Sequence, residues 1–371
     1  MRISLVIANM GLGGSQYAMA WLAGALAARG HAVQLCTFDP PGQAPFFPLS
    51  PAVRLERLGL SGHSRNILHA AWANVRRLRA LRRTVLAHRP DVVLSFIDQM
   101  NVLSLCALSG ALPVVVSERV DPSRHQIGWL WAGLRRLTYA LAKAIVVQTR
   151  ETADFFPVRL RRRCVVIPNA VLPPEARGQA GPQEPRLPAP CVVGLGRLHA
   201  QKGFDLLLKA FARGKAAHPG WELRIFGEGP QRGELEALCA SLGLDPAEVL
   251  PGAESRTASI LSQAGIFVLS SRFEGFPNAL CQAMAHGVPV IAADCPAGPG
   301  EIVRHGVDGL LVPPEDVPAL ALALEGLMGN GERRADLGRR GREILTRFHP
   351  DGVLAAWEAL LQGAAAGRGA G

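Results

Sequence analysis

The side chains best suited to chemistry lie in the second half of the chain. The run Gly194-Leu195-Gly196-Arg197 ends a predicted strand, and Gln201-Lys202-Gly203 opens the next predicted helix. Two cations five residues apart across such a turn can converge on one diphosphate, Arg197 as a bidentate fork and Lys202 as a point charge. Surface arginines and lysines are common, so this pair gains weight only from the residues around it.

A second cluster follows a predicted buried strand, where the sequence SSRFEGFPN leads into a helix. We expect Asn278 to be the N-cap, with the N–H groups of Ala279 and Leu280 directed at a phosphate. Glu274 precedes this position in a loop, where its carboxylate can accept hydrogen bonds from sugar hydroxyls; a merely solvated carboxylate is the alternative. Gln282 lies one helical turn further, on the same face as Asn278.

A glycine-rich loop, NMGLGGS, lies between the first predicted strand and the first predicted helix. Glycines let the backbone approach a ligand, and a helix N-terminus offers N–H groups to a phosphate. A dinucleotide fingerprint fits poorly, because Gln16 occupies the third glycine position and Asp39 is 28 residues after Gly11 instead of ~20. A tight turn without any ligand is the other interpretation.

These residues must be held by strands and helices, and both halves of the chain show the same alternation of the two. Strands interleaved with helices of about 10–15 residues are typical of parallel, doubly wound α/β sheets. The cleft outside the carboxyl ends of such sheets is where their ligands bind. The predicted strands are Arg2–Ala8, Ala32–Phe38, Asp91–Phe96, Pro113–Ser117 and Ala144–Val147, then Cys191–Gly194, Glu222–Phe226, Val249–Leu250, Ile266–Leu269 and Pro289–Ala292.

Proline marks the boundary between the halves, with six prolines between Leu172 and Pro190. So many prolines are incompatible with a helix or a central strand in this segment. We therefore predict two Rossmann-like domains, 1–171 and 191–348, joined by a linker at 172–190. Residues 349–371 form a last helix with a Gly/Ala-rich tail, and packing of this helix on the first domain is one option.

Charge is unevenly distributed. Residues 1–170 carry 21 Lys and Arg against 8 Asp and Glu, a net charge of +13, and residues 171–371 carry 19 against 22, a net charge of −3. The first half is expected to meet an anionic partner: a membrane, a nucleic acid or a phosphorylated substrate. An arginine-rich genome is the competing explanation. No aromatic stacking motif or recognition module supports nucleic acid.

The basic predicted helix 66–88 has an apolar stripe among its arginines, and 159–163 is a second arginine cluster. Such a helix can lie on an anionic membrane, or its stripe can pack on the sheet while its arginines are solvated. The apolar run Ile3–Ala8 is too short for a signal peptide, and no run is long enough to span a membrane. Seven scattered cysteines fit reduced thiols, not disulfides or a zinc site.

Taken together, three blocks resemble glycosyltransferase family 4 in order and spacing: GRLHAQKGFDLLLKAF, FGEGP and SSRFEGFPNALCQAMAHGVPVIAADCPAGPGEIVRHGVDGLLVP. The resemblance spans about residues 1–350, and VVSERVDP and DCPAGP are most similar to bacterial enzymes that extend lipid-linked exopolysaccharide, O-antigen or N-glycan precursors. It implies a GT-B fold and retaining transfer from a nucleotide-sugar, expected to be a UDP-hexose or UDP-N-acetylhexosamine. It also implies no metal and no cofactor, which agrees with the lack of a D-x-D motif. The expected acceptor is a glycan on a lipid diphosphate, at the cytoplasmic face of the plasma membrane.

The resemblance gives each matched residue a role. Arg197 and Lys202 would neutralise the leaving diphosphate, and Glu274 would be the first acid of the family's E-x7-E motif, contacting the transferred sugar. The remaining donor-binding residues would be Gly13, Gly14, Gly196, Asn278, Ala279, Leu280 and Gln282.

Two positions depart from the family pattern. The second acid of E-x7-E is here Gln282, which predicts weaker donor binding with activity retained. Many members have a His after the fourth strand, where this chain has Glu118 and Arg119. Glu118 is a candidate for orienting an acceptor hydroxyl and Arg119 for contacting a phosphate; a buried ion pair between them is the alternative. A nucleotide-sugar epimerase of the same fold and a weakly active sugar-nucleotide-binding relic are the rival functions.

Overall fold

The computed structural model describes residues 1–62, 67–125, 127–174 and 186–367, and it divides into two compact units. Unit 1 comprises Met1–Ala170 together with Asp351–Gly371, and unit 2 comprises Val171–Pro350. Most of the predicted linker, residues 175–185, and the predicted start of the basic helix at Asn66 lie outside the described residues.

Unit 1 is built on a parallel sheet whose described strands run in the order β3-β2-β1-β4-β5-β6-β7. The strands are β1 (Arg2–Val6), β2 (Ala32–Thr37), β3 (Arg54–Arg57), β4 (Val92–Phe96), β5 (Val114–Ser117), β6 (Ala144–Val147) and β7 (Cys164–Val166). The helices are α1 (Gly14–Ala28), α2 (Ile67–His88), α3 (Asp98–Leu108), α4 (Trp129–Thr138), the 3-10 turn η1 (Tyr139–Leu141), α5 (Arg150–Asp154), α6 (Val158–Arg161) and α16 (Pro350–Ala366).

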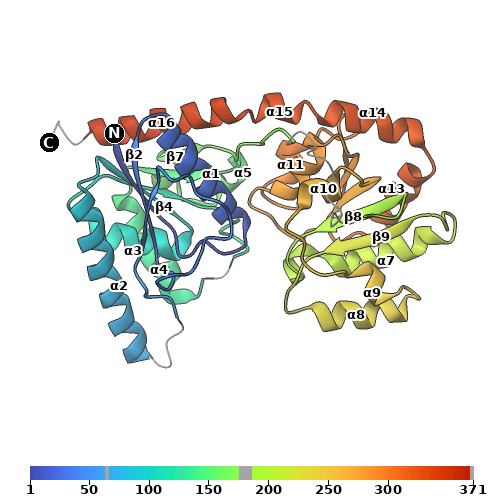
Figure 1. Cartoon of the computed structure of the whole chain (residues 1–371), viewed down its shortest axis with the longest axis horizontal. Helices are drawn as coiled ribbons and strands as arrows, with labels where there is room; N and C mark the ends of the chain where they lie inside the picture. The colour runs from blue at the N-terminus through green and yellow to red at the C-terminus, as the bar shows by residue number, and fades with distance from the viewer. Residues whose placement is uncertain (63–66, 126, 175–185, 368–371) are drawn as a thin grey trace. The chain divides into compact units, whose positions relative to one another are not determined.

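The strands of unit 1 send alternate side chains to two separate cores, as period-2 strands covered on both faces must. In β4, Leu94 packs with α1 and α16, whereas Val93 packs with α2 and α3. The last helix, α16, lies against this unit (Figure 1), where its Trp357 ring is 6.0 Å from the Phe96 ring. Residues 351–366 are therefore part of the first unit's core.

Unit 2 has a smaller parallel sheet, with the described strands in the order β12-β11-β10-β8-β9. The strands are β8 (Cys191–Leu195), β9 (Glu222–Phe226), β10 (Ile266–Leu269), β11 (Val290–Ala293) and β12 (Leu310–Val312). The helical elements are η2 (Ala200–Lys202), α7 (Phe204–Lys215), α8 (Arg232–Ser241), α9 (Pro246–Val249), α10 (Thr257–Leu261), α11 (Asn278–Ala285), α12 (Pro299–Ile302), α13 (Val317–Met328), α14 (Gly331–Gly341) and α15 (Ile344–Arg347).

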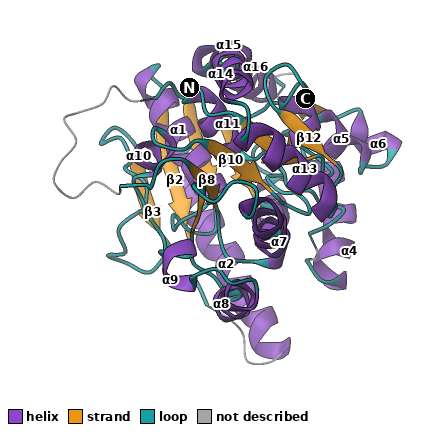
Figure 2. Ribbon diagram, turned by 90° about the vertical axis from the view of Figure 1, so that its right-hand side faces the viewer, coloured by secondary structure: helices purple, strands orange, loops and turns teal. Residues whose placement is uncertain are grey.

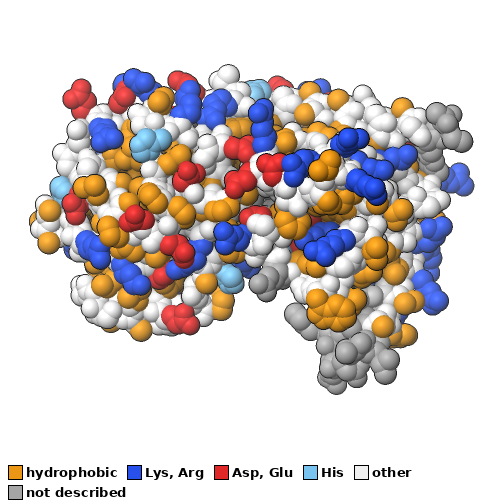
Figure 3. Space-filling model, turned by 180° about the vertical axis from the view of Figure 1, so that it is seen from behind, with side chains coloured by type: hydrophobic (Ala, Val, Ile, Leu, Met, Phe, Trp, Pro, Cys, Tyr) orange, Lys and Arg blue, Asp and Glu red, His pale blue; other side chains and the backbone are white. Residues whose placement is uncertain are grey.

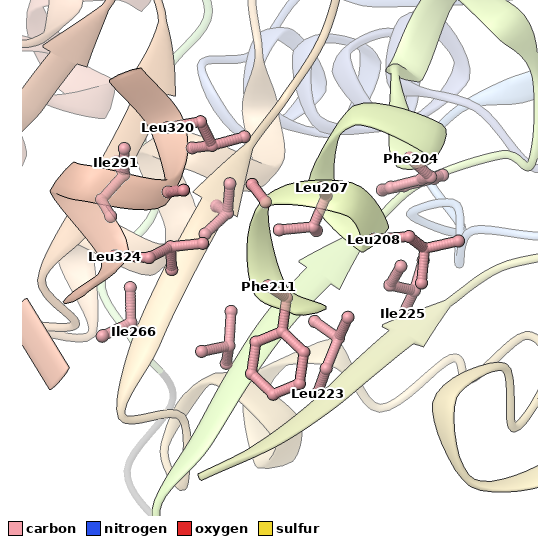
Figure 4. Packing of buried hydrophobic residues seen from close by; sticks show 14 of the residues in the cluster. Phe204, Leu207, Leu208, Phe211, Leu223, Ile225, Ile266, Ile291, Leu320 and Leu324 are labelled. Carbon is pink, nitrogen blue, oxygen red and sulfur yellow. The ribbon is translucent and has the colours of Figure 1, made fainter. Parts of the chain in front are cut away.

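The core of unit 2 is held by α7 and α13 on one face of the sheet. Figure 4 shows Phe211 of α7 beside Leu223 of β9, and Leu208 beside Ile225. These side chains are fully buried, and the burial of each contributes about 1.5–3 kcal/mol. This packing fixes the turn that carries Lys202, because that turn leads directly into α7.

The two doubly wound sheets confirm the predicted fold class, but some strands differ from the prediction. The predicted strand Val249–Leu250 is wrong, because Val249 ends α9, a helix capped by Asp245 through the Ala247 N–H at 2.9 Å. Three strands were not predicted: β3, β7 and β12. All three are edge strands of three or four residues, too short to show a periodic pattern.

Candidate active site

The carboxyl ends of the adjacent strands β8 and β10 bring two loops together. Gly203, at the junction of η2 and α7, has φ +60°, and a Cβ there would lie 2.1 Å from the Ser270 carbonyl oxygen. Only glycine allows this approach. The Ser270 hydroxyl donates to the Lys202 carbonyl at 2.9 Å, which fastens the lysine-bearing turn to the end of β10.

Across this contact, Lys202 and Glu274 form an ion pair, with the ammonium Nζ 2.7 Å from Oε1. The Ser271 hydroxyl donates to the same Oε1 at 2.6 Å. The Glu274 side chain is only 6% exposed and that of Lys202 23%. Within the described chain, Oε2 of Glu274 has no hydrogen-bond partner, so half of a buried carboxylate remains available to a ligand.

Arg272, in the same loop, has a different task. Its guanidinium binds both carboxylate oxygens of Asp205, at 2.9 and 2.8 Å, and also contacts Glu315 at 2.7 Å. Burial raises the pKa of Asp205, but the hydrogen bonds and charge of Arg272 outweigh it and leave this pKa below its usual value. Arg272 therefore holds the loop against α7. No motif in the sequence indicates this role.

Arg197 follows β8 and is exposed. In the part of the chain that the structure describes, its side chain forms no hydrogen bond or ion pair, unlike Arg272 and Lys202. Its neighbour Gly196 lies against the Lys202 side chain, since a Cβ on Gly196 would be 3.3 Å from the lysine Cε. The Arg197 guanidinium, without a partner in the described chain, therefore directly follows a glycine that packs on the Lys202 side chain.

Helix α11 begins at Asn278, so the predicted N-cap is displaced by one residue. Pro277 occupies the cap position, and it provides no side-chain capping hydrogen bond. The Cys281 N–H donates to the Pro277 carbonyl at 3.2 Å, so the N–H groups of Ala279 and Leu280 precede the first helical hydrogen bond.

Gln282, one turn into α11, is half-buried, and its side chain makes no hydrogen bond within the described residues. Its amide is therefore available to a ligand, like Oε2 of Glu274.

In unit 1, the glycine loop meets α1 as predicted: Gly13 precedes the helix and Gly14 is its first residue. A Cβ on Gly13 would lie 2.3 Å from the Gln16 Oε1, so the loop is closely folded on this side chain. Asp39 is buried and accepts the Met10 N–H at 2.9 Å. This carboxylate therefore holds the backbone of the glycine loop.

Glu118 and Arg119, at the carboxyl end of β5, are both buried, but they do not pair with each other. Glu118 accepts the Tyr139 hydroxyl at 2.5 Å and lies 3.8 Å from Arg135. Burial raises the pKa of Glu118 to about 7, although Arg135 lowers it.

Arg119 has no carboxylate partner within the described residues. It donates to Asn169 and to the Ser117 hydroxyl, and its guanidinium lies 4.4 Å from the centre of the Phe96 ring. Its buried Nε atom has no partner in the described chain. Burial lowers the pKa of Arg119 to about 9. A buried cation without an anion is costly, so this position favours an anionic ligand.

The described residues contain no group of three or more His, Cys, Asp or Glu side chains placed to hold a metal ion. None of their helices is both long and apolar enough to cross a bilayer.

Comparison with known proteins agrees with this architecture. Residues 13–170 match the glycosyl transferase 4-like domain, and residues 189–330 match the family described as glycosyl transferases group 1. Sucrose-phosphate synthase from Thermosynechococcus elongatus has the same fold, with a TM-score of 0.81, 22% identity and 99% of each chain covered. HepE of Anabaena, solved with UDP-glucose, has a TM-score of 0.75 at 17% identity, covering 98% of this chain and all of that one. The chain belongs to glycosyltransferase family 4 and has the GT-B fold.

Several relatives in sequence are named as bacterial exopolysaccharide or lipopolysaccharide enzymes. An N-acetylgalactosaminyltransferase of Campylobacter jejuni, named for an acceptor on undecaprenyl diphosphate, is 26% identical over 97% of this chain and 98% of its own length. An exopolysaccharide phosphotransferase of Streptomyces coelicolor is 39% identical, but the match spans 58% of this chain and 23% of that protein. The lipopolysaccharide core glycosyltransferase LpsE of Rhizobium meliloti is 32% identical over about half of each chain.

Proposed function

We propose that this chain is a retaining glycosyltransferase that moves a sugar from a nucleotide-sugar to a hydroxyl of a growing bacterial glycan. The observation that carries the proposal is the Lys202–Glu274 pair, a buried carboxylate with one free oxygen held beside a cation. Arg197, which has no partner in the described chain, and the N-terminus of α11 add positive potential at the carboxyl ends of the same strands.

In this mechanism, charge on the departing diphosphate is stabilised by Arg197, Lys202 and the N–H groups of Ala279 and Leu280. The free oxygen of Glu274 accepts a hydrogen bond from the transferred sugar, and Gln282 accepts one from the nucleotide ribose. The bond from the anomeric carbon to the phosphate oxygen breaks as the acceptor oxygen bonds on the same face. The acceptor's proton passes to the leaving phosphate oxygen, so no external base is required.

We further propose a UDP-linked donor, with Gly13 and Gly14 also contacting it, and an acceptor glycan on a lipid diphosphate at the cytoplasmic face of the plasma membrane. Support comes from HepE, which was solved with UDP-glucose, and from the acceptor in the name of the Campylobacter relative. The buried, unpaired Arg119 supports an anionic group on the acceptor side. Because Tyr139 and Arg135 hold Glu118, this residue is proposed to position its neighbours around the acceptor hydroxyl.

The test is a thermal-shift screen of nucleotide-sugars, followed by measurement of UDP release with and without a lipid-linked acceptor. A ligand that binds only the native state raises the melting temperature. We expect one UDP-sugar to raise it, and UDP to appear only when acceptor is present. Conversion of the UDP-sugar into its epimer without acceptor and without net release of UDP would favour the epimerase, and a shift without any turnover would favour the relic.

A further inference from the structure

Helix α4 carries apolar side chains on two sides. Trp131 and Leu134 pack on the core of unit 1, beside the buried Arg135 and Thr138, whereas Trp129 is 87% exposed and Leu137 74%. A helix on a soluble protein normally turns its apolar stripe inward. Arg135 has a reason to face inward, since it lies 3.8 Å from the buried Glu118, but nothing within the described chain covers the outer face.

Neighbouring elements extend this apolar surface. The Arg135 guanidinium lies 5.0 Å from the centre of the Phe155 ring after α5, and Arg163 donates to the Ala140 and Ala142 carbonyl groups beside η1. Figure 2 shows α4, α5 and α6 together at its right-hand edge. We call this surface the α4–α6 face; its exposed apolar residues are Trp129, Leu130, Leu137, Leu141, Phe155 and Val158.

The surroundings of the α4–α6 face are strongly basic. Between positions 124 and 163 the sequence has nine Lys and Arg residues against two acids, Glu151 and Asp154. Asp154 is paired with Arg161 at 3.1 Å. Figure 3 shows arginine and lysine side chains among hydrophobic ones on the surface of unit 1, with few acidic side chains between them. This combination suits an apolar partner with an anionic rim.

We propose that the α4–α6 face docks on an anionic lipid bilayer, with Trp129 and the exposed leucines entering the interface and the arginines binding headgroup phosphates. The inference rests on the proposed lipid-linked acceptor, which requires the enzyme to work at a membrane. Charge argues against a second copy of this chain as the occupant, because the basic rims of two copies would repel each other.

The basic helix α2, expected from the sequence to lie on the membrane, has a weaker claim. Its Leu81 and Val85 are fully buried against the sheet and α3. Its exposed Trp72 lies under the Arg76 guanidinium, 4.7 Å from it, so part of this ring is already covered. This helix therefore serves as the comparison surface in the test.

The experiment is flotation of the full chain with vesicles of phosphatidylcholine alone or mixed with phosphatidylglycerol, without donor or acceptor. The wild type is expected to float with the anionic vesicles, and less so at high salt. The variant Trp129→Ser/Leu137→Ser/Leu141→Ser should bind about tenfold more weakly or worse, because several apolar side chains no longer enter the interface. Trp72→Ser/Val75→Ser on α2 and Leu322→Ser, 71% exposed on unit 2, should float like the wild type.

The proposal is overturned if the wild type does not float with either kind of vesicle. It is also overturned if the triple variant floats as well as the wild type, or if the α2 variant loses vesicle binding instead. Self-association at this face, seen as a wild-type dimer that the triple variant abolishes, would also overturn it. The thermal shift with a UDP-sugar and transfer to a water-soluble acceptor should be unchanged in the triple variant. Vesicle binding without any transfer would contradict the proposed function and leave the docking surface standing.

Discussion

The Lys202 ammonium lies 2.7 Å from the Glu274 carboxylate, although 72 positions separate the two residues along the chain. The fold accounts for the meeting, because β8 and β10 are adjacent parallel strands and the two loops follow their carboxyl ends. The pair shields one oxygen of a buried acid and leaves the other for a ligand.

Removing the cation should therefore cost stability as well as activity. Lys202→Ala leaves Glu274 buried with only Ser271 as partner, and the free energy of unfolding is expected to fall by about 1–3 kcal/mol. Lys202→Ala/Glu274→Gln should recover at least half of this loss, because the unpaired charge is gone. Thermal denaturation checks both values, with exposed Lys209→Ala as the control. Equal losses in the single and double variants would contradict the ion pair's structural role.

Arg197 should matter to the donor and not to the fold. Because its side chain has no partner in the described chain, Arg197→Met is expected to leave the melting temperature unchanged. It should weaken UDP binding by about tenfold, the loss of one charge-assisted contact. Titration calorimetry with UDP measures this, and the exposed Arg213→Met provides a matched control. Identical UDP affinities in the two variants would remove Arg197 from the diphosphate site.

Gln282 is the position at which a substitution should improve the enzyme. Its amide can give a neutral hydrogen bond of about 0.5–1.5 kcal/mol, where a carboxylate would give a charge-assisted one of about 1.5–3 kcal/mol. Gln282→Glu is therefore expected to lower the donor KM roughly tenfold without a matching change in kcat. An unchanged KM would show that this side chain does not bind the ribose.

Glu118 should make the stability of unit 1 depend on pH. Burial raises the pKa of Glu118 to about 7 from 4.5, so the folded state holds a proton that the unfolded state releases in this interval. The free energy of unfolding should then fall by about 3 kcal/mol as the pH rises from 4.5 to above 7. Glu118→Gln stays neutral and keeps an acceptor for Tyr139, so this fall should disappear.

Urea denaturation of both proteins at pH 5 and pH 8 measures the effect, with exposed Glu332→Gln as the control. If wild type and Glu118→Gln lose the same stability between these pH values, the titrating group is another one.

The sequence predicted those parts of the fold in which a pattern repeats. Mainly apolar runs such as Val92–Phe96 identified the central strands, whereas β3, with the sequence RLER, carries no apolar run at all. The strand predicted at Val249–Leu250 was wrong because Asp245 and Pro246 form a helix start, and two apolar residues alone do not distinguish a strand from a helix.

In the candidate site, motif spacing indicated Arg197, Lys202 and Glu274, but it could not show what holds them. Ser271 and the Asp205–Arg272 pair are ordinary residues in sequence, and their role depends on contacts between segments far apart in the chain. The same limit applies to Glu118, whose real partners, Tyr139 and Arg135, lie 21 and 17 positions away.

The return of α16 to unit 1 has a consequence for how the protein is made. All of unit 2 is encoded between the two segments of unit 1, so a ribosome completes unit 2 before it synthesises Val353, Leu354 and Trp357. Domains generally fold as they emerge. The N-terminal unit is translated first, but part of its core therefore stays uncovered until α16 has been synthesised. It is the second of the two units to complete its fold.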